Sequence, residues 1–497
     1  MDTVTDTAMD TAMVQRIRKS KFYLVGIVLL VARPSLAADV KITPRVESEF
    51  TYTDNVNLVA TDEQSSEITS LIAGLEINAD GNDGNITLDY QAQQLLYSYD
   101  SSENKLYNDL NFSADKGLFS TTNFRGELDA SVTNVARNIE TNASNDVTTG
   151  DTIETRTFGG GLSYQSNPLG VMDLSAKVYG SVKNNEDSIG DSQSYSGELT
   201  SKQGRAIKDY FWLADYSYDT TVGKNEENNT EATELNNELG FQPINGFSPY
   251  MHLYYEDYSG QSSSDSADSS SWGPGLKYYI SRYSYFDFGY DFVLDDSNSD
   301  YFRGGFHFNP SIRTVLDFQY KKRFYGDSYA FSFTHRSRRL TNSITYVEDV
   351  SNYNRSLYVD GNEIEQLTIY KTLSWNSSLA FQRSALNLKV STEKQSAFTN
   401  ISSNTDVNKY SGELSFDHRM TRDTTISPGF SYDYYEFIAF GQTTQEDYYR
   451  KWDVDLTHSF ARDLRLKFSL SYQDRSSTLS SSGYQEGRVS INLRKEL

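Results

Sequence analysis

The chain alternates between apolar and polar residues over many stretches. Residues 329–335 read Y-A-F-S-F-T-H, so Tyr329, Phe331, Phe333 and His335 share one face and small or hydroxyl residues share the other. A period of two is typical of a β-strand with one apolar and one polar face. The same pattern recurs in residues 209–219, 248–259 and 283–294. No helical period of useful length follows Ala38, so an all-β fold is predicted.

The lengths of the strands and of their connections point to a membrane barrel. The predicted strands run ~9–14 residues, which exceeds the ~5–6 of soluble sheets and suits a tilted membrane crossing. Long acidic connections, expected around 53–66, 138–152, 183–193, 221–234, 259–270, 351–363, 396–408, 438–447 and 476–483, alternate with tight turns. Those turns are expected at Asn167-Pro168, Gln203-Gly204, Asn245-Gly246, Asn309-Pro310, Arg338-Arg339 and Arg462-Asp463. We therefore predict a closed antiparallel up-and-down transmembrane β-barrel of roughly 22–24 strands.

Composition supports this prediction and excludes other classes. Hydrophobic residues make up only 37 % of the 497 residues, yet aromatic residues make up 14 %. A mean hydropathy of −0.61 argues against a bundle of membrane helices, and the aromatic content argues against a disordered chain. The absence of cysteine excludes a disulfide scaffold, and the net charge of −23 argues against nucleic acid as a partner. Aromatic residues are expected largely on the lipid face, with polar residues lining a lumen.

The N-terminus has the pattern of an export signal. A basic segment with Arg16, Arg18, Lys19 and Lys21 precedes an apolar run over 22–32, and Ser35-Leu36-Ala37 supplies small residues for cleavage. We expect cleavage between Ala37 and Ala38, which leaves 38–497 as a single barrel domain. The alternative is a membrane anchor, and either Met1 or Met13 is the start. Cleavage removes five basic and three acidic residues, so the mature net charge is −25.

One group of charged residues is a candidate lumen site. If Leu316, Phe318 and Tyr320 face lipid, period two turns their neighbours inward. The inward residues then include Asp317, Lys321, Arg323, Arg336 and Arg338. One hypothesis is a charged lumen ladder that guides an anionic polymer or filters solutes. The alternative is that these charges pack in the lumen against acids such as Asp317, Glu348 and Asp349, or belong to periplasmic turns.

Other sequence features do not indicate catalysis or metal binding. The run 80–85 (D-G-N-D-G-N) lacks the distal Glu of a calcium loop and is predicted to be a hairpin turn. The five histidines form no zinc-protease motif, and no nucleophile elbow or phosphate-binding loop occurs. We therefore predict a non-enzymatic protein with no cofactor and no metal site.

Three segments resemble a known family. These are residues 309–350, with G-D-S-Y, H-R-S-R-R and E-D-V, the T-D-N-V-N-L at 53–58, and the L-D-Y-Q-A-Q-Q-L-L-Y at 88–97. Together they resemble the PEP-CTERM system-associated outer-membrane β-barrel family. The resemblance implies a Gram-negative outer-membrane protein linked to exosortase and exopolysaccharide clusters. The chain departs from the usual aromatic C-terminus, since it ends in Leu497.

The leading expectation is an outer-membrane barrel that serves exopolysaccharide secretion, with a polymer export pore as one form of that role. The alternatives are a general porin, a hydrolase with a site at the barrel rim, and a soluble β-rich periplasmic protein. The expected partners are outer-membrane lipid and lipopolysaccharide, the outer-membrane assembly machinery, and an anionic exopolysaccharide with its secretion components.

Overall fold

The computed structural model describes most of the chain after residue 38. The described residues are 39–119, 123–137, 142, 146–223, 229–260, 267–294, 299–351, 368–397, 405–439, 442–479 and 482–497. The expected signal peptide over 1–37 and the cleavage site at Ala37 and Ala38 lie outside them.

The described residues form one 24-stranded sheet with a single short 3-10 turn, η1 (Ser101–Glu103). The strands of the first half are β1 (Asp39–Thr53), β2 (Ser66–Gly81), β3 (Gly84–Tyr97), β4 (Lys105–Gly117), β5 (Phe124–Ala136), β6 (Thr152–Gln165), β7 (Met172–Asn185), β8 (Ser192–Gln203), β9 (Tyr210–Gly223), β10 (Thr230–Phe241), β11 (Phe247–Gly260) and β12 (Ala267–Ser281). Those of the second half are β13 (Ser284–Val293), β14 (Tyr301–Ser311), β15 (Thr314–Arg323), β16 (Gly326–Arg336), β17 (Leu340–Ser351), β18 (Thr368–Ala380), β19 (Ser384–Ala397), β20 (Thr405–Arg419), β21 (Thr424–Ala439), β22 (Gln442–Ser459), β23 (Leu464–Ser477) and β24 (Tyr484–Glu496).

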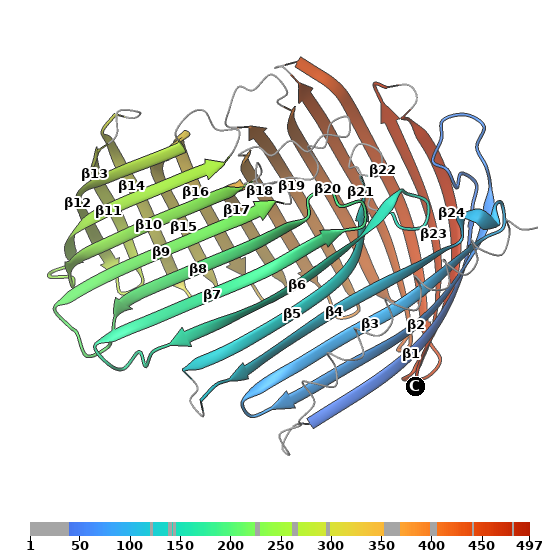
Figure 1. The fold of residues 1–497 in the computed structure, drawn as a ribbon, viewed down its shortest axis with the longest axis horizontal. Coiled ribbons are helices and arrows are strands. Elements are labelled where there is room, and N and C mark those ends of the chain that lie inside the picture. The colour runs from blue at the N-terminus through green and yellow to red at the C-terminus, as the bar shows by residue number, and fades with distance from the viewer. Residues whose placement is uncertain are drawn as a thin grey trace, which may run out of the picture.

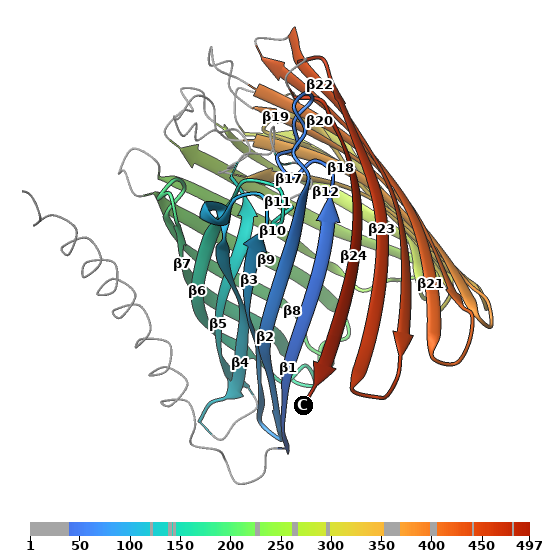
Figure 2. The same cartoon turned by 90° about the vertical axis from the view of Figure 1, so that its right-hand side faces the viewer.

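The sheet closes on itself. Each strand pairs antiparallel with the next along the chain, and β1 pairs antiparallel with β24, from Arg45 opposite Glu496 to Thr53 opposite Arg488. Figure 2 shows these first and last strands side by side. Closure leaves no unpaired edge, which is the condition for strands to cross lipid. The predicted all-β, closed up-and-down barrel is confirmed, with 24 strands.

The barrel has two unequal rims. We call the side that carries both strand termini the short-turn rim, because its connections have at most six residues. The opposite side, the long-loop rim, has connections of up to 16 residues, as predicted. One predicted loop, 438–447, is wrong. There β21 and β22 continue to within two residues of each other, because Tyr435 and Phe437 pack against inner-wall residues of neighbouring strands. The two-residue connection Phe324-Tyr325 on the same rim was not expected.

Two predicted tight turns have the geometry that their residues favour. Asn245 and Gly246 both have positive φ, at 52° and 87°, which a two-residue hairpin with the twist of its strands requires. The calcium-like run 80–85 contains the hairpin turn between β2 and β3, whose register closes with Gly81 opposite Gly84. The turn prediction for that run is confirmed.

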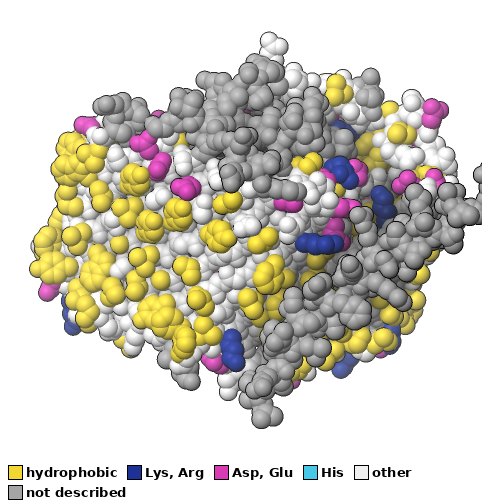
Figure 3. Space-filling view, viewed as in Figure 1, with side chains coloured by type: hydrophobic (Ala, Val, Ile, Leu, Met, Phe, Trp, Pro, Cys, Tyr) yellow, Lys and Arg dark blue, Asp and Glu magenta, His cyan; other side chains and the backbone are white. Residues whose placement is uncertain are grey.

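The outer face of the barrel is apolar. On β1, Val40, Ile42, Val46, Phe50 and Tyr52 alternate with inward residues and are 45–57 % exposed. The register continues such rows from strand to strand, as in the row Phe50, Ile491, Phe468, Leu456 and Ile426. Figure 3 shows hydrophobic side chains spread over the face formed by β7 to β11, with charged side chains mostly toward its edges. Such an outer face belongs in lipid.

Among the residues that the structure describes, no helix has both the length and the apolar character needed for a membrane crossing.

Candidate functional site on the inner wall

The inner wall consists of the alternate residues that face away from lipid. On β1 these include Arg45, Thr51 and Thr53, which are buried. Arg45 shows how they are satisfied, since its guanidinium donates to Asp89 Oδ1 at 2.6 Å and Gln91 Oε1 at 3.1 Å, two strands away. Polar side chains on this wall therefore bond laterally to each other.

Arg323, at the long-loop end of β15, makes a contact across the lumen. Its Nε donates to Glu256 Oε2 at 2.9 Å and its Nη2 donates to Tyr258 Oη at 2.7 Å, both on β11. The backbone N–H of Phe324 donates to the other carboxylate oxygen of Glu256 at 2.8 Å. The Glu256 side chain is 0 % exposed and that of Arg323 is 8 % exposed. Only β12, β13 and β14 separate β11 from β15 in the wall, so this contact bridges the curved end of the barrel at the left of Figure 1, which we call the narrow end.

Lys321 makes a second contact of the same kind. Its Nζ lies 3.4 Å from Glu234 Oε1 on β10 and 4.1 Å from the centre of the Tyr254 ring on β11. A cation over an aromatic face is attracted by the negative charge density of that face. Lys321 and Arg323 together hold β15 against β10 and β11.

A further charged network fills the wall between β10 and β14. Asp291 is 0 % exposed, and it lies 3.1 Å from His252 Nδ1 and accepts from Arg303 Nε at 3.1 Å. Asp287 accepts from Tyr250 Oη at 2.5 Å, and Lys277 pairs with Glu238. With the contacts of β15, these ion pairs occupy the lumen at the narrow end of the barrel.

The five predicted site residues lie at different heights along β15 and β16. Lys321 and Arg323 face inward, as does Asp317, which contacts His307. Arg336 ends β16 and Arg338 lies in the next turn, and both are exposed on the short-turn rim. The register runs from Thr314 opposite His335 to Arg323 opposite Gly326, so Arg323 and Arg336 lie ~30 Å apart along the strands, with Asp317 between them. The structure does not bring the five together as one ladder.

Sequence reasoning missed the partners of these cations. Glu234 and Glu256 lie 87 and 67 residues before Lys321 and Arg323. Period two gives only the face on which a residue lies, not which strands approach across a lumen. One pattern in the sequence could have pointed to these partners. On β11, Tyr250, Tyr254 and Tyr258 share a face with Glu256. These tyrosines line the inner wall, so the expected placement of aromatics largely on the lipid face is incomplete.

The described residues 146–149 of the connection between β5 and β6 lie against the inner wall. Arg488 on β24 donates from Nη2 to Asp146 Oδ2 at 2.8 Å and to Thr149 Oγ1 at 3.0 Å. Tyr97 on β3 donates to the carbonyl of Thr148 at 2.6 Å. Burial alone would raise the pKa of Asp146. The Arg488 guanidinium and the N–H groups of Thr148 and Thr149 outweigh burial and lower that pKa. A loop segment is thus fastened by charge inside the mouth at the long-loop rim.

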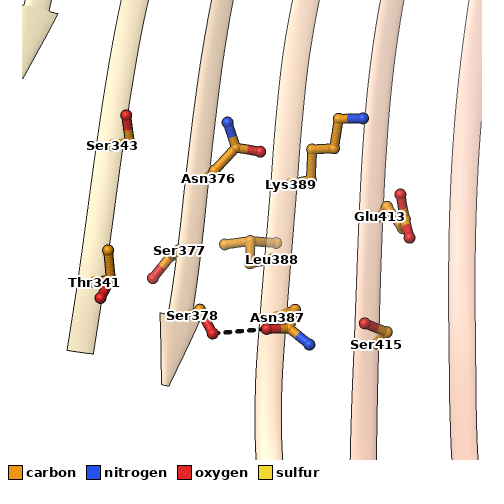
Figure 4. A pocket seen from close by; sticks show the side chains of 10 residues that line it. All are labelled: Thr341, Ser343, Asn376, Ser377, Ser378, Asn387, Leu388, Lys389, Glu413 and Ser415. Carbon is orange, nitrogen blue, oxygen red and sulfur yellow. Dashed lines mark hydrogen bonds between the residues drawn. The ribbon is translucent and has the colours of Figure 1, made fainter. Parts of the chain in front are cut away.

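A polar cavity lies on the inner wall between β17 and β20. It has a volume of about 320 Å³, and one of its few internal bonds is donated by Ser378 Oγ to Asn387 Oδ1 at 2.8 Å (Figure 4). Lys389 and Glu413 are the only charged side chains in its lining. The other lining residues are Thr341, Ser343, Asn376, Ser377, Ser378, Asn387, Leu388 and Ser415. Seven of the ten lining residues carry a hydroxyl or an amide group, in contrast to the ion pairs of the narrow end.

Within the described ranges no group of three or more His, Cys, Asp or Glu residues could hold a metal ion.

Comparison with known proteins supports a porin-like barrel. Residues 351–497 match the family described as "Putative beta-barrel porin 2", which is less than a third of the chain. No curated protein matches the sequence.

Solved structures of several outer-membrane proteins align with this chain at low identity and low TM-score. The FrpB iron transporter from Neisseria meningitidis is 10 % identical, with 92 % of this chain and 83 % of that chain covered and a TM-score of 0.45. The siderophore receptor PirA from Pseudomonas aeruginosa is 9 % identical, with 91 % and 80 % covered and a TM-score of 0.43. OccK2 from Pseudomonas aeruginosa in complex with glucuronate is 10 % identical, with 92 % and 98 % covered and a TM-score of 0.36.

These structural similarities are too distant to assign an activity. The closed barrel, with its apolar outer face and polar inner wall, defines the chain, and residues 351–497 are similar to that porin family. It is a porin-like β-barrel protein whose fold indicates the outer membrane.

Proposed function

We propose that the protein is a non-enzymatic general porin, a passive channel for small hydrophilic solutes. The observation that carries this proposal is the uneven inner wall. Ion pairs fill the narrow end around β10 to β15, whereas the wall from β17 to β20 holds a cavity lined mainly by hydroxyl and amide groups. Such groups exchange hydrogen bonds with water and sugars at little cost, because no strong ion pair must be broken.

The proposal is tested by conductance. The purified barrel, in a planar lipid bilayer, should give stepwise currents, and vesicles that contain it should swell in neutral sugars. Outer-membrane fractionation and heat-dependent gel mobility would show that the barrel is folded. A folded barrel that gives no current and no swelling would overturn the proposal.

A second candidate, service to exopolysaccharide secretion, rests on the resemblance of residues 53–58, 88–97 and 309–350 to the PEP-CTERM-associated family. The partners that this resemblance implies, an anionic polymer and its secretion components, are part of the same proposal. Deletion of the gene should then remove polymer from the cell surface. Wild-type surface polymer in the deletion strain would contradict this role and leave the porin proposal standing.

A further inference from the structure

One structural unit recurs at the short-turn rim on the lipid-facing side. His335, His418 and His458 each stand one residue before the end of β16, β20 and β22. Each Nδ1 is hydrogen-bonded to the hydroxyl of the residue directly opposite, which begins the preceding strand. The partners are Thr314 at 2.9 Å, Ser384 at 2.8 Å and Thr424 at 2.9 Å.

The same unit places an arginine and an apolar residue at fixed distances along the chain. Four residues after each histidine comes an arginine: Arg339, Arg422 and Arg462. In β18 Leu379 replaces the histidine and faces Leu340 instead of a hydroxyl, yet Arg383 follows at the same spacing. The residue midway is Phe381, Met420 or Phe460 in three of the four turns, and these side chains are 48, 51 and 60 % exposed.

These arginines differ from the cations of the inner wall. Arg383 and Arg422 are exposed and make no ion pair with any acid that the structure describes, and the same holds for Arg339 and Arg462. Directly above them, toward the middle of the barrel, the outer rows are apolar, as with Leu414 and Phe416. The rim thus presents free guanidinium groups at the boundary of the lipid-facing surface.

We propose that this arc of the short-turn rim, from β16 to β23, binds the phosphate groups of anionic phospholipids in the adjacent leaflet. A guanidinium matches a phosphate with two parallel hydrogen bonds, and basic residues beside a membrane surface attract anionic lipid. The exposed Phe381, Met420 and Phe460 would rest among the acyl chains next to each headgroup. The proposal rests on the outer-membrane placement of the barrel, and it does not depend on conduction.

The test compares two triple variants of the full chain. Arg383→Gln, Arg422→Gln and Arg462→Gln together remove three charges from the arc. The control, Arg205→Gln, Lys208→Gln and Arg282→Gln, removes three charges from the same rim outside the arc. Detergent-solubilised barrels are equilibrated with equal amounts of phosphatidylglycerol and phosphatidylcholine, and retained lipid is counted by native mass spectrometry.

We expect wild type and control to retain phosphatidylglycerol in preference to phosphatidylcholine. In the arc variant, the ratio of retained phosphatidylglycerol to phosphatidylcholine should fall about tenfold. Equal loss in both variants, or no loss in the arc variant, would overturn the proposal. So would tight binding of a soluble acidic polypeptide to the arc without any lipid preference. Heat-dependent gel mobility verifies folding, and single-channel current of the arc variant should stay at the wild-type level. Absence of current in the wild type would count only against the porin proposal.

Discussion

At the scale of single residues, burial decides which charged side chains contribute most to the stability of the barrel. Glu256 and Arg323 are almost fully buried, whereas Arg156, paired with Glu154, is 68 % exposed. A buried charge that loses its partner keeps the full cost of leaving water, while an exposed one is rehydrated. Substitution in the contact between Glu256 and Arg323 should therefore change the free energy of unfolding strongly.

Glu256→Gln should lower the free energy of unfolding by about 3–5 kcal/mol, because it leaves the Arg323 guanidinium buried without a counter-charge. Unfolding by guanidinium chloride in detergent micelles measures this change. The control Arg156→Gln should change the same free energy by less than ~1 kcal/mol. Similar small effects of both substitutions would mean that the contact across the lumen does not form.

The link between Asp146 and Arg488 predicts a dependence on pH. The pKa of Asp146 in the folded barrel lies below its ordinary 3.8, so the link stabilises the loop at every pH above that value. Its contribution is lost as the pH falls below 3.8 and through the folded pKa. Acid should therefore release the segment 146–149 from the inner wall.

A spin label reports this release cleanly, because the chain has no cysteine of its own. Labelled Val147→Cys should give an immobilised spectrum at pH 7 and become mobile only once the pH has fallen below the lowered pKa of Asp146 in the folded barrel. Adding Asp146→Asn should make the label mobile at pH 7 as well. An immobilised spectrum in that double variant would refute the charge-based account of the loop.

At the scale of strands, alternation predicted the lipid-facing residues but not the contacts inside. The row of Tyr329, Phe331, Phe333 and His335 lies together on the outer face as period two requires, opposite Tyr320, Phe318, Leu316 and Thr314. On β11 both faces carry tyrosines, since Tyr255 points outward beside Met251 and Leu253, and Tyr250, Tyr254 and Tyr258 point inward. Only the arrangement of distant strands decides what the inner set contacts.

The pairs of histidine and hydroxyl predict a coupling between β17 and β18. Leu340 and Leu379 occupy the positions that Thr424 and His458 hold in β21 and β22. Leu379→His alone should destabilise the barrel, because the new ring lacks a hydroxyl partner. Adding Leu340→Thr should recover roughly 0.2–1 kcal/mol, as cross-strand polar pairs do. A double-mutant cycle of unfolding free energies measures the coupling, and strict additivity would contradict it.

At the scale of the whole molecule, the sequence was sufficient to predict a closed barrel. It was not sufficient to predict which parts of the wall approach each other inside the barrel. Strand length, the two kinds of connection and the roughly 22–24 expected strands agree with the 24 observed, because each depends on local pattern. The narrow end could not be foreseen, since it arises from pairs such as Lys321 with Glu234, which are far apart along the chain. The candidate ladder residues do not form one cluster, because the local register of the β15–β16 hairpin puts Arg336 and Arg338 at the other rim.

The mature chain should begin at Ala38. We predict that residues 1–37 act as a signal peptide and are removed on export, so protein taken from the outer membrane should lack them. Intact-mass measurement of that protein distinguishes cleavage after Ala37 from retention of the segment. A mass that includes residues 1–37 would support the alternative of a membrane anchor.

If the porin proposal holds, solutes should pass along the polar wall from β17 to β20 and not through the charged region around β10 to β15. Ser415→Cys places a thiol in the cavity, and the matched Asn236→Cys places one in the charged network beside His252. A negatively charged, membrane-impermeant thiol reagent is added during single-channel recording. We expect the current to fall stepwise for Ser415→Cys and to remain unchanged for Asn236→Cys. The reverse pattern, or a folded barrel that carries no current before the reagent is added, would contradict passage of solutes along the wall from β17 to β20.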